Sequence, residues 1–170
     1  MPYEFKATRR VEFSDTDMAG IVHFSAFFRY FETVEHAFIR SLGYSVVLPN
    51  THPPMGFPRV HASCDYRRPL RFEDLVELHL LVAEKKRRAL TYQIRFRRLE
   101  PGPVEEVAVG KLIVVCVQKN PDGQFQAVDL PAGLADQIQP APAELLQLPG
   151  KPVGAPETGG RQHRDSVASG

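Results

Sequence analysis

Cysteine is scarce in this chain of 170 residues, and its two cysteines lie far apart. Cys64 and Cys116 each stand inside an apolar stretch, without the spacing of a disulfide framework or a zinc site. We therefore expect both to be small buried hydrophobes, as in a reducing cytoplasm. A single domain of this length needs no cross-link, because it buries roughly 68–70% of its unfolded surface.

Excess charge of either sign is also lacking, since the formal net charge is +1. Such a balance gives no overall attraction for nucleic acid or an anionic membrane, so anions must be recognised by a local cluster. There is no apolar run of about 18 residues, and the first ten residues, MPYEFKATRR, lack the apolar stretch of a signal peptide. We expect a soluble cytoplasmic protein without a membrane span and without a nucleic-acid partner.

Residue periodicity predicts one strand over residues 3–13 and a long helix over residues 25–42. Ser25 is the candidate N-cap of the helix, and Gly43 stands just past its end. The apolar surface of this helix is wider than one stripe, which favours a place in the core. Four further strands are predicted, and the last is apolar on both faces, as expected in the middle of a sheet. They cover residues 60–66, 76–82, 90–96 and 107–117.

Short connections such as EKKRR and EPGPVEE predict antiparallel neighbours among the later strands. One strand, one long helix and four strands form an α+β pattern, and a five-stranded antiparallel sheet wrapped around the helix would bury it. We expect this domain over residues 1–138. Residues 139–170 are rich in Pro, Gly and Ala, which predicts a flexible C-terminal tail with at most a weak docking contact through Leu145 and Leu146.

The segment FSDTDMAGIVHFSAFFRYFE contains an Asp-x-Asp-x-x-Gly-x-Val loop, followed by aromatic residues and a Phe-Glu pair on the helix. The residues at these positions are Asp15, Asp17, Gly20, Val22, Phe31 and Glu32. With this pattern the sequence resembles the 4-hydroxybenzoyl-CoA thioesterase-like family of hot-dog acyl-CoA thioesterases. The segments DYRRPLRFEDLVEL and GKLIVVCVQ extend the resemblance over about residues 3 to 138. It implies the hot-dog fold and hydrolysis of an acyl-CoA thioester without a cofactor or metal.

The resemblance implies that Asp17 is the catalytic carboxylate, either as a general base for water or as a nucleophile that forms a transient anhydride. It assigns the backbone N–H of Phe24 to the thioester carbonyl, and helix starts do supply free N–H groups and a favourable dipole. Gly20 lets the loop backbone pass close to the substrate. Without the family, Asx-turns or a helix cap are the alternative use of both aspartates, and we expect Asp15 to shape the loop.

The sequence departs from the family after Val22, where many members have an aromatic residue and then His. Here His23 comes before Phe24. A shift of one residue at a helix entrance turns a side chain by about 100°, so His23 does not inherit the role of the family's histidine. It is expected to orient the catalytic carboxylate or to line the acyl pocket, with an ordinary loop histidine as the alternative. Ala26 and Phe27 replace the usual Asn-Tyr, which predicts a more apolar acyl site.

A basic run at the turn between two predicted strands includes Lys86, Arg87 and Arg88. These residues are candidates for binding the phosphates of CoA through charge-assisted hydrogen bonds, as the family often does after this strand. A solvated turn is the alternative. A second group of basic residues ranks behind them, namely Arg67, Arg68 and Arg71.

Two carboxylates lie on the long helix, where another branch of the hot-dog thioesterases carries its catalytic group. The alternative, which we favour, is a buried acceptor or subunit contact for Glu32 and simple solvation for Glu35.

Three readings of the whole chain remain open. The first is an acyl-CoA thioesterase that forms a homodimer or homotetramer, since pairing would protect open sheet edges. The second is a domain that only binds an acyl thioester or serves as an assembly subunit. The third is a Mg²⁺-dependent phosphotransferase of the haloacid dehalogenase type, which carries Asp-x-Asp after a strand but requires alternating strands and helices around a parallel sheet.

Overall fold

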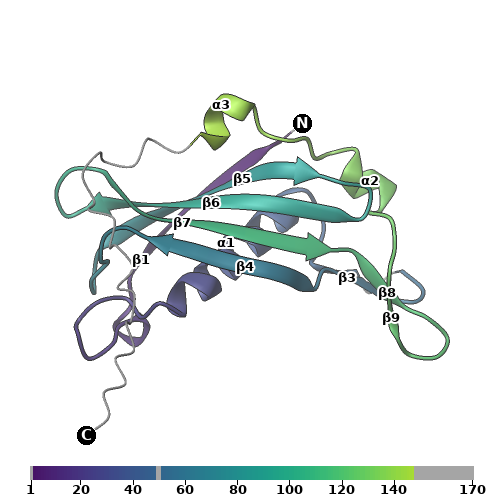
Figure 1. Cartoon of the computed structure of the whole chain (residues 1–170), viewed down its shortest axis with the longest axis horizontal. Coiled ribbons are helices and arrows are strands. Elements are labelled where there is room, and N and C mark those ends of the chain that lie inside the picture. The colour runs from purple at the N-terminus through teal and green to yellow at the C-terminus, as the bar shows by residue number, and fades with distance from the viewer. Residues whose placement is uncertain (1, 49–50, 148–170) are drawn as a thin grey trace, which may run out of the picture.

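The computed structural model describes residues 2–48 and 51–147. One long helix, α1 (Ala26–Ser41), lies against one face of a five-stranded sheet (Figure 1). Every strand pair of this sheet is antiparallel, and the strand order is β1-β5-β6-β7-β4. The strands are β1 (Glu4–Arg10), β4 (Arg59–Tyr66), β5 (Leu75–Lys85), β6 (Ala89–Glu100) and β7 (Glu105–Val115). The predicted α+β class and the five strands around one helix are confirmed.

The strand predicted for the middle of the sheet, β7, lies between β6 and the edge strand β4. It is therefore internal, but β6 is the central strand. Consecutive strands β5, β6 and β7 are neighbours, as their short connections predict, whereas β4 pairs with β7 instead of β5. Since β4 lies at the edge next to β7, the chain passes the positions of β7 and β6 between β4 and β5.

Aromatic side chains fill the interface between α1 and the sheet. Phe31 packs against Phe96 of β6 with ring centroids 5.5 Å apart, and Phe38 packs edge-on against Tyr92 at 6.2 Å. Gly110 of β7 leaves room for Phe31, because a Cβ atom at Gly110 would lie 2.0 Å from Cζ of that ring. Burial of each such side chain contributes about 1.5–3 kcal/mol, so this packing fixes where α1 crosses the sheet.

A second, small sheet has the order β2-β3-β8-β9 and extends the molecule beyond one end of the main sheet (Figure 1). The Pro-rich sequence before β4 gives no strand signal, so this sheet was not predicted. A 3-10 turn and two short helices complete the structure. The bounds of these elements are β2 (Val47–Leu48), β3 (Met55–Gly56), β8 (Val117–Lys119), β9 (Phe125–Ala127), η1 (Phe13–Asp15), α2 (Ala132–Ala135) and α3 (Ala143–Leu146).

The chain stays in contact with the sheet after residue 138. The N–H of Ala141 donates to the carbonyl of Val82 at 2.8 Å, and Arg95 donates to the carbonyl of Gln147 at 3.0 Å. Helix α3 contains Leu145 and Leu146, both half-buried. The domain boundary at residue 138 stays a prediction, and most of the predicted tail, residues 148–170, lies outside the described residues.

The environment of Glu35 differs from the prediction of simple solvation, because its side chain is 1% exposed. Glu35 comes four residues after Phe31 and three before Phe38, so it lies on the helix face that meets the sheet. Arg59 at the start of β4 donates to Oε2 of Glu35 at 2.7 Å. Glu32 is 52% exposed, so it is not a buried acceptor. Burial raises the pKa of Glu35 to about 7, against the opposing effect of the Arg59 charge.

Because the carboxyl of Glu35 is buried, we expect the free energy of unfolding of the parent protein to fall as the pH rises through the range between its unfolded and folded pKa values. Its folded-state pKa of about 7 lies above the ordinary value of 4.5, so the folded state binds more protons between these values. The Glu35→Gln variant should therefore gain stability relative to the parent, by on the order of 2 kcal/mol, between pH 5 and pH 8. Urea unfolding at several pH values measures this difference, with Glu32→Gln as the matched control on the same helix. A difference for Glu35→Gln that grows toward low pH contradicts the raised pKa.

Candidate active site

The loop between β1 and α1 is folded as a short hairpin. The N–H of His23 donates to the carbonyl of Asp15 at 2.8 Å, and the N–H of Asp17 donates to the carbonyl of Ile21 at 2.9 Å. Gly20 closes the turn, since its N–H donates to the carbonyl of Asp17 at 2.9 Å and its φ is +71°. This backbone conformation favours glycine, so a glycine at this position serves the turn itself.

The two side-chain oxygens of Asp17 have different environments. Oδ1 accepts a hydrogen bond from the N–H of Ala19 at 2.8 Å, which is the Asx-turn that the sequence left as an alternative. Oδ2 has no hydrogen-bond partner among the residues that the structure describes. The structural and chemical uses of Asp17 are thus compatible, because one oxygen holds the turn and the other is available.

Beside Asp17 the surface is hollowed into a cavity of about 510 Å³, within the range of ordinary ligand sites. The N–H of Phe24, just before α1, donates to no acceptor within residues 2–48 and 51–147. The Phe24 carbonyl accepts a hydrogen bond from the Tyr66 hydroxyl at 3.2 Å. The cavity is lined mainly by apolar groups, and its lining residues are Asp17, Ile21, Val22, Phe24, Phe27, Tyr66, Arg67, Arg68, Pro69 and Leu70.

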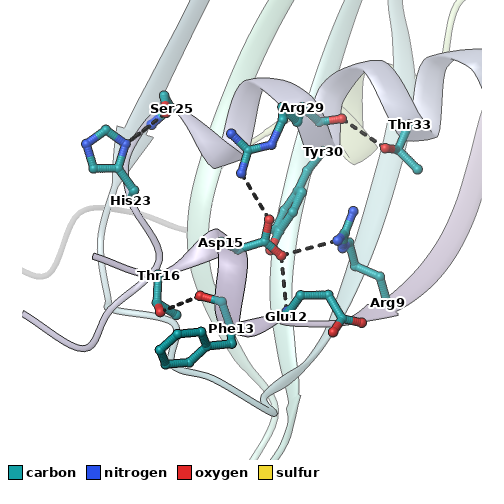
Figure 2. Close-up of polar contacts among 10 residues, drawn as sticks. All are labelled: Arg9, Glu12, Phe13, Asp15, Thr16, His23, Ser25, Arg29, Tyr30 and Thr33. Atoms are coloured by element: carbon teal, nitrogen blue, oxygen red, sulfur yellow. Dashed lines mark hydrogen bonds and ion pairs between the residues drawn. The ribbon is translucent and has the colours of Figure 1, made fainter. Parts of the chain in front are cut away.

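The His23 side chain is exposed and turned toward the start of α1. Its Nδ1 lies 2.8 Å from Oγ of Ser25, and its ring centroid lies 4.4 Å from that of Phe24 (Figure 2). Ser25 precedes α1 as predicted, but its side chain caps no helix N–H because the hydroxyl pairs with His23. In the described part of the chain, the His23 ring forms hydrogen bonds with Ser25 and none with Asp17, and the role of His23 stays a prediction.

The basic residues occupy two opposite ends of the sheet. Arg67 and Arg68, which ranked second in the sequence, line the cavity of Asp17 and pair with carboxylates of β7. Arg87 and Arg88 lie at the β5–β6 turn and both pair with Asp129. In the same turn Lys86 pairs with Glu84. Because β5 has 11 residues, its two ends are about 35 Å apart, so this turn does not reach Asp17 of its own chain.

Tyr66 contributes to the cavity although the sequence analysis did not single it out. The signal was present, since Ala62, Cys64 and Tyr66 alternate along β4 and must share one face. What the sequence could not show is that this face ends beside the loop of Asp17, because that depends on the crossing from β4 to β5.

Asp15 is 4% exposed and lies beneath the loop, where several side chains converge on it (Figure 2). Its carboxylate accepts hydrogen bonds from the Tyr30 hydroxyl at 2.7 Å, from Arg29 at 3.0 Å and from Arg9 at 3.2 Å. Burial alone would raise its pKa, but the hydrogen bonds from Tyr30, Glu12 and Arg29 outweigh this effect and hold the pKa below its ordinary value. Asp15 is therefore ionised and fully paired.

The phosphotransferase reading is wrong, because it requires a parallel sheet and every pairing of the main sheet is antiparallel. In the described ranges, no group of three or more His, Cys, Asp or Glu side chains is arranged to hold a metal ion. The helices of the described residues are also too short or too polar to cross a membrane.

Sequence comparison identifies related proteins. Residues 19–105 match the model of the Thioesterase superfamily. A putative esterase of Aquifex aeolicus (strain VF5) is 37% identical over 124 residues, which cover 71% of this chain and 88% of the relative. A 1,4-dihydroxy-2-naphthoyl-CoA hydrolase of Nostoc punctiforme is 31% identical over 125 residues, which cover 68% of this chain and 76% of that protein. This chain spans about half the length of several other hydrolases of the same name.

Several solved structures with a similar arrangement of elements are thioesterases. The 4-hydroxybenzoyl-CoA thioesterase of Pseudomonas sp. strain CBS-3 has a TM-score of 0.69 at 19% identity, covering 79% of this chain and 99% of that one. A gentisyl-coenzyme A thioesterase has a TM-score of 0.66 at 25% identity, covering 76% of this chain and 98% of that one.

Proposed function

Because this chain belongs to the thioesterase superfamily and is a thioester hydrolase of the hot-dog fold, we propose that it hydrolyses an acyl- or aryl-CoA thioester with Asp17 and the backbone N–H of Phe24. One observation carries the proposal. The unpaired oxygen of Asp17 and the unpaired N–H of Phe24 belong to residues that border the same apolar cavity at the start of α1. A thioester carbonyl needs both an attacking or proton-accepting oxygen and a donor for the developing oxyanion.

Two routes use these groups, and both end in free acid and CoA. In the first, Asp17 takes a proton from a water molecule whose oxygen adds to the thioester carbon. In the second, Asp17 adds to the carbon itself, CoA leaves, and water then hydrolyses the mixed anhydride. In both routes the carbonyl oxygen becomes an oxyanion that the Phe24 N–H stabilises before the C–S bond breaks.

The acyl group is expected to be apolar or aromatic. Phe24, Phe27 and Tyr66 contribute three aromatic side chains to the cavity, and Ile21 and Leu70 contribute aliphatic ones. Aromatic faces pack well against a planar acyl group, at offset or edge-on geometries. The relatives named for 1,4-dihydroxy-2-naphthoyl-CoA and gentisyl-coenzyme A agree with this expectation.

We propose in addition that two chains associate through β4. Every residue of this edge strand except Cys64 is exposed, including the apolar side chain of Val60, which is 61% exposed. An exposed apolar edge strand is a template for pairing with another strand. In a twofold dimer the two β4 strands run antiparallel, so Arg59 of one chain lies near the partner's Tyr66. A tetramer made from two such dimers remains compatible with this contact.

The antiparallel pairing gives the basic β5–β6 turn a function that it lacks within one chain. The turn lies at the Arg59 end of β4, because the N–H of Cys116 donates to the carbonyl of Arg88 and Arg59 pairs with Val114. In the dimer this end approaches the cavity that contains the partner's Asp17. Lys86, Arg87 and Arg88 would then bind CoA phosphates in the partner's site.

The carboxylate assignment predicts that Asp17→Asn retains the fold and substrate binding but loses hydrolysis. Asparagine keeps the acceptor for the Ala19 N–H and removes the basic and nucleophilic oxygen. We expect kcat to fall at least roughly a hundredfold, with little change in KM. Release of free CoA measures the rate, a thermal melt checks folding, and Asp122→Asn in the β8–β9 turn is the control. Near-normal turnover by folded Asp17→Asn would overturn the assignment and favour a helix carboxylate, tested by Glu32→Gln.

The assembly predicts a mass of at least twice the 19.1 kDa of one chain in light scattering. A lysine in an edge strand opposes strand pairing, so Val60→Lys should shift the protein toward monomer at micromolar concentration. Val104→Lys is the matched control, because Val104 is also 61% exposed but lies outside β4. A parent protein that is monomeric, or a Val104→Lys variant that dissociates equally, argues against pairing through β4.

The basic turn predicts that Arg87→Ala with Arg88→Ala raises KM for acyl-CoA about tenfold and leaves kcat nearly unchanged. Phosphate binding is remote from the reacting carbonyl, so its loss weakens ground state and transition state equally. The effect should shrink at high salt. Steady-state kinetics at two ionic strengths measure it, with Arg40→Ala on α1 as a control for loss of positive charge. An unchanged KM at low salt means that the turn is only solvated.

A further inference from the structure

We infer that Asp15 is a positioning residue for hydrolysis. By joining three segments of the chain, it fixes the position of the Asp17 carboxylate relative to the Phe24 N–H. This inference rests on the proposed function, since it concerns the same two catalytic groups. It goes further because it assigns a kinetic role to a buried residue that does not border the cavity.

Three segments of the chain meet at the carboxylate of Asp15. Arg9 comes from β1, Arg29 and Tyr30 come from the first residues of α1, and the N–H of Glu12 comes from the turn before η1 (Figure 2). The Glu12 N–H donates to Oδ2 of Asp15 at 3.1 Å. Arg9 also lies over the Tyr30 ring, with its Cζ 4.1 Å from the ring centroid. A displacement of strand, turn or helix would thus break a charge-assisted hydrogen bond.

The backbone connects Asp15 to both proposed catalytic groups. Asp15 precedes Asp17 by two residues on the first arm of the loop, and its carbonyl accepts the N–H of His23 on the second arm. Thr16, which follows Asp15, and Val22, which precedes His23, form an antiparallel bridge between the two arms. Since His23 precedes Phe24 directly, both arms are fixed at Asp15, one leading to the Asp17 carboxylate and the other to the Phe24 N–H.

The rate of hydrolysis is sensitive to the relative positions of the Asp17 carboxylate and the Phe24 N–H. The oxygen of Asp17 must reach the carbonyl carbon, or the water that attacks it, while the N–H of Phe24 reaches the carbonyl oxygen. A misplacement of about 1 Å can cost a hundredfold in rate even when it arises far from the reacting atoms. The acyl cavity itself is formed mostly by other side chains, so substrate binding should tolerate such a change better than turnover does.

The test is Asp15→Asn, which keeps the size of the side chain but removes the charge that pairs with both arginines. We expect kcat to fall about tenfold to a hundredfold and KM to stay within about twofold. Asp74→Asn is the matched control, because Asp74 is equally buried at 4% and also accepts a backbone N–H, from Arg71 at 2.8 Å. It should lower the melting temperature comparably and leave kcat within about twofold.

Two milder variants decide the question if Asp15→Asn does not fold. Tyr30→Phe removes only the hydroxyl that donates to Asp15, and Arg29→Met removes a guanidinium from a residue that is 56% exposed. Each should lower kcat about threefold to tenfold, whereas Arg40→Met, farther along α1, should not. All rates are measured well below the melting temperature, so that the folded fraction is complete.

Asp17→Asn is measured in parallel to separate this inference from the proposed function. If Asp17→Asn is inactive while folded Asp15→Asn keeps a normal kcat, Asp15 is only a structural residue and the inference is wrong. The inference is also wrong if Asp15→Asn raises KM and leaves kcat unchanged. If Asp17→Asn itself stays active, the proposed function fails first, and the inference fails with it.

Discussion

Phe31 of α1 occupies the space that Gly110 leaves open in β7, and the remainder of the molecule depends on this contact. A side chain at position 110 would clash with the ring, so the helix can lie this close to β7 because that position is a glycine. Phe27 and Phe38, four residues before Phe31 and seven after it, continue the same face along the sheet. The helix start is thereby placed beside the end of β4. The cavity of Asp17 exists because a helix start, a loop and a strand end meet at that point.

The direction of the strands determines which charged residues can cooperate. In the main sheet, Asp17 follows β1 at one end and the basic β5–β6 turn lies at the other, on opposite sides of a strand of 11 residues. Within one chain, the arginines that line the cavity of Asp17 are Arg67 and Arg68, and both are paired with glutamates of β7. In a single chain, the positive charges that line the acyl cavity are thus balanced by the paired glutamates. In the dimer proposed above, a second chain paired along β4 would bring further positive charge to this cavity.

Much of this architecture could be predicted from the sequence, because alternation and helical spacing are local signals. The helix of α1 and all five strands of the main sheet are examples. Two features could not be predicted, and both depend on contacts between distant residues. The burial of Glu35 needs Arg59, which lies 24 positions further along the chain. The small sheet pairs β3 with β8, whose residues are about 60 positions apart, across a Pro-rich segment without periodicity.

The candidate site shows the same division. The motif pointed to Asp17 and Gly20, and the family resemblance pointed to the N–H of Phe24. The turn of the loop follows from the backbone preference of Gly20. Which basic residues lie near Asp17 could not be predicted, because their distance from Asp17 depends on strand order and direction. Tyr66 was overlooked for a similar reason. Its side chain faces the cavity only because β4, an edge strand, ends beside the loop that precedes α1.

The two aspartates of the motif, separated by one residue, have environments that suit opposite tasks. Asp15 receives four donors, of which two are guanidinium groups, and so its charge is buried without an open acceptor. A carboxylate in that state is a poor base, because protonation would break several charge-assisted hydrogen bonds. Asp17 lines the cavity, gives one oxygen to a turn and leaves the other without a hydrogen-bond partner among the described residues. A reactive carboxylate needs this freedom. The Asp17 side chain accepts only one hydrogen bond among the described residues, from the N–H of Ala19, yet it also needs a fixed position. The buried neighbour can provide it at no cost to reactivity, since its charge is already satisfied by other groups.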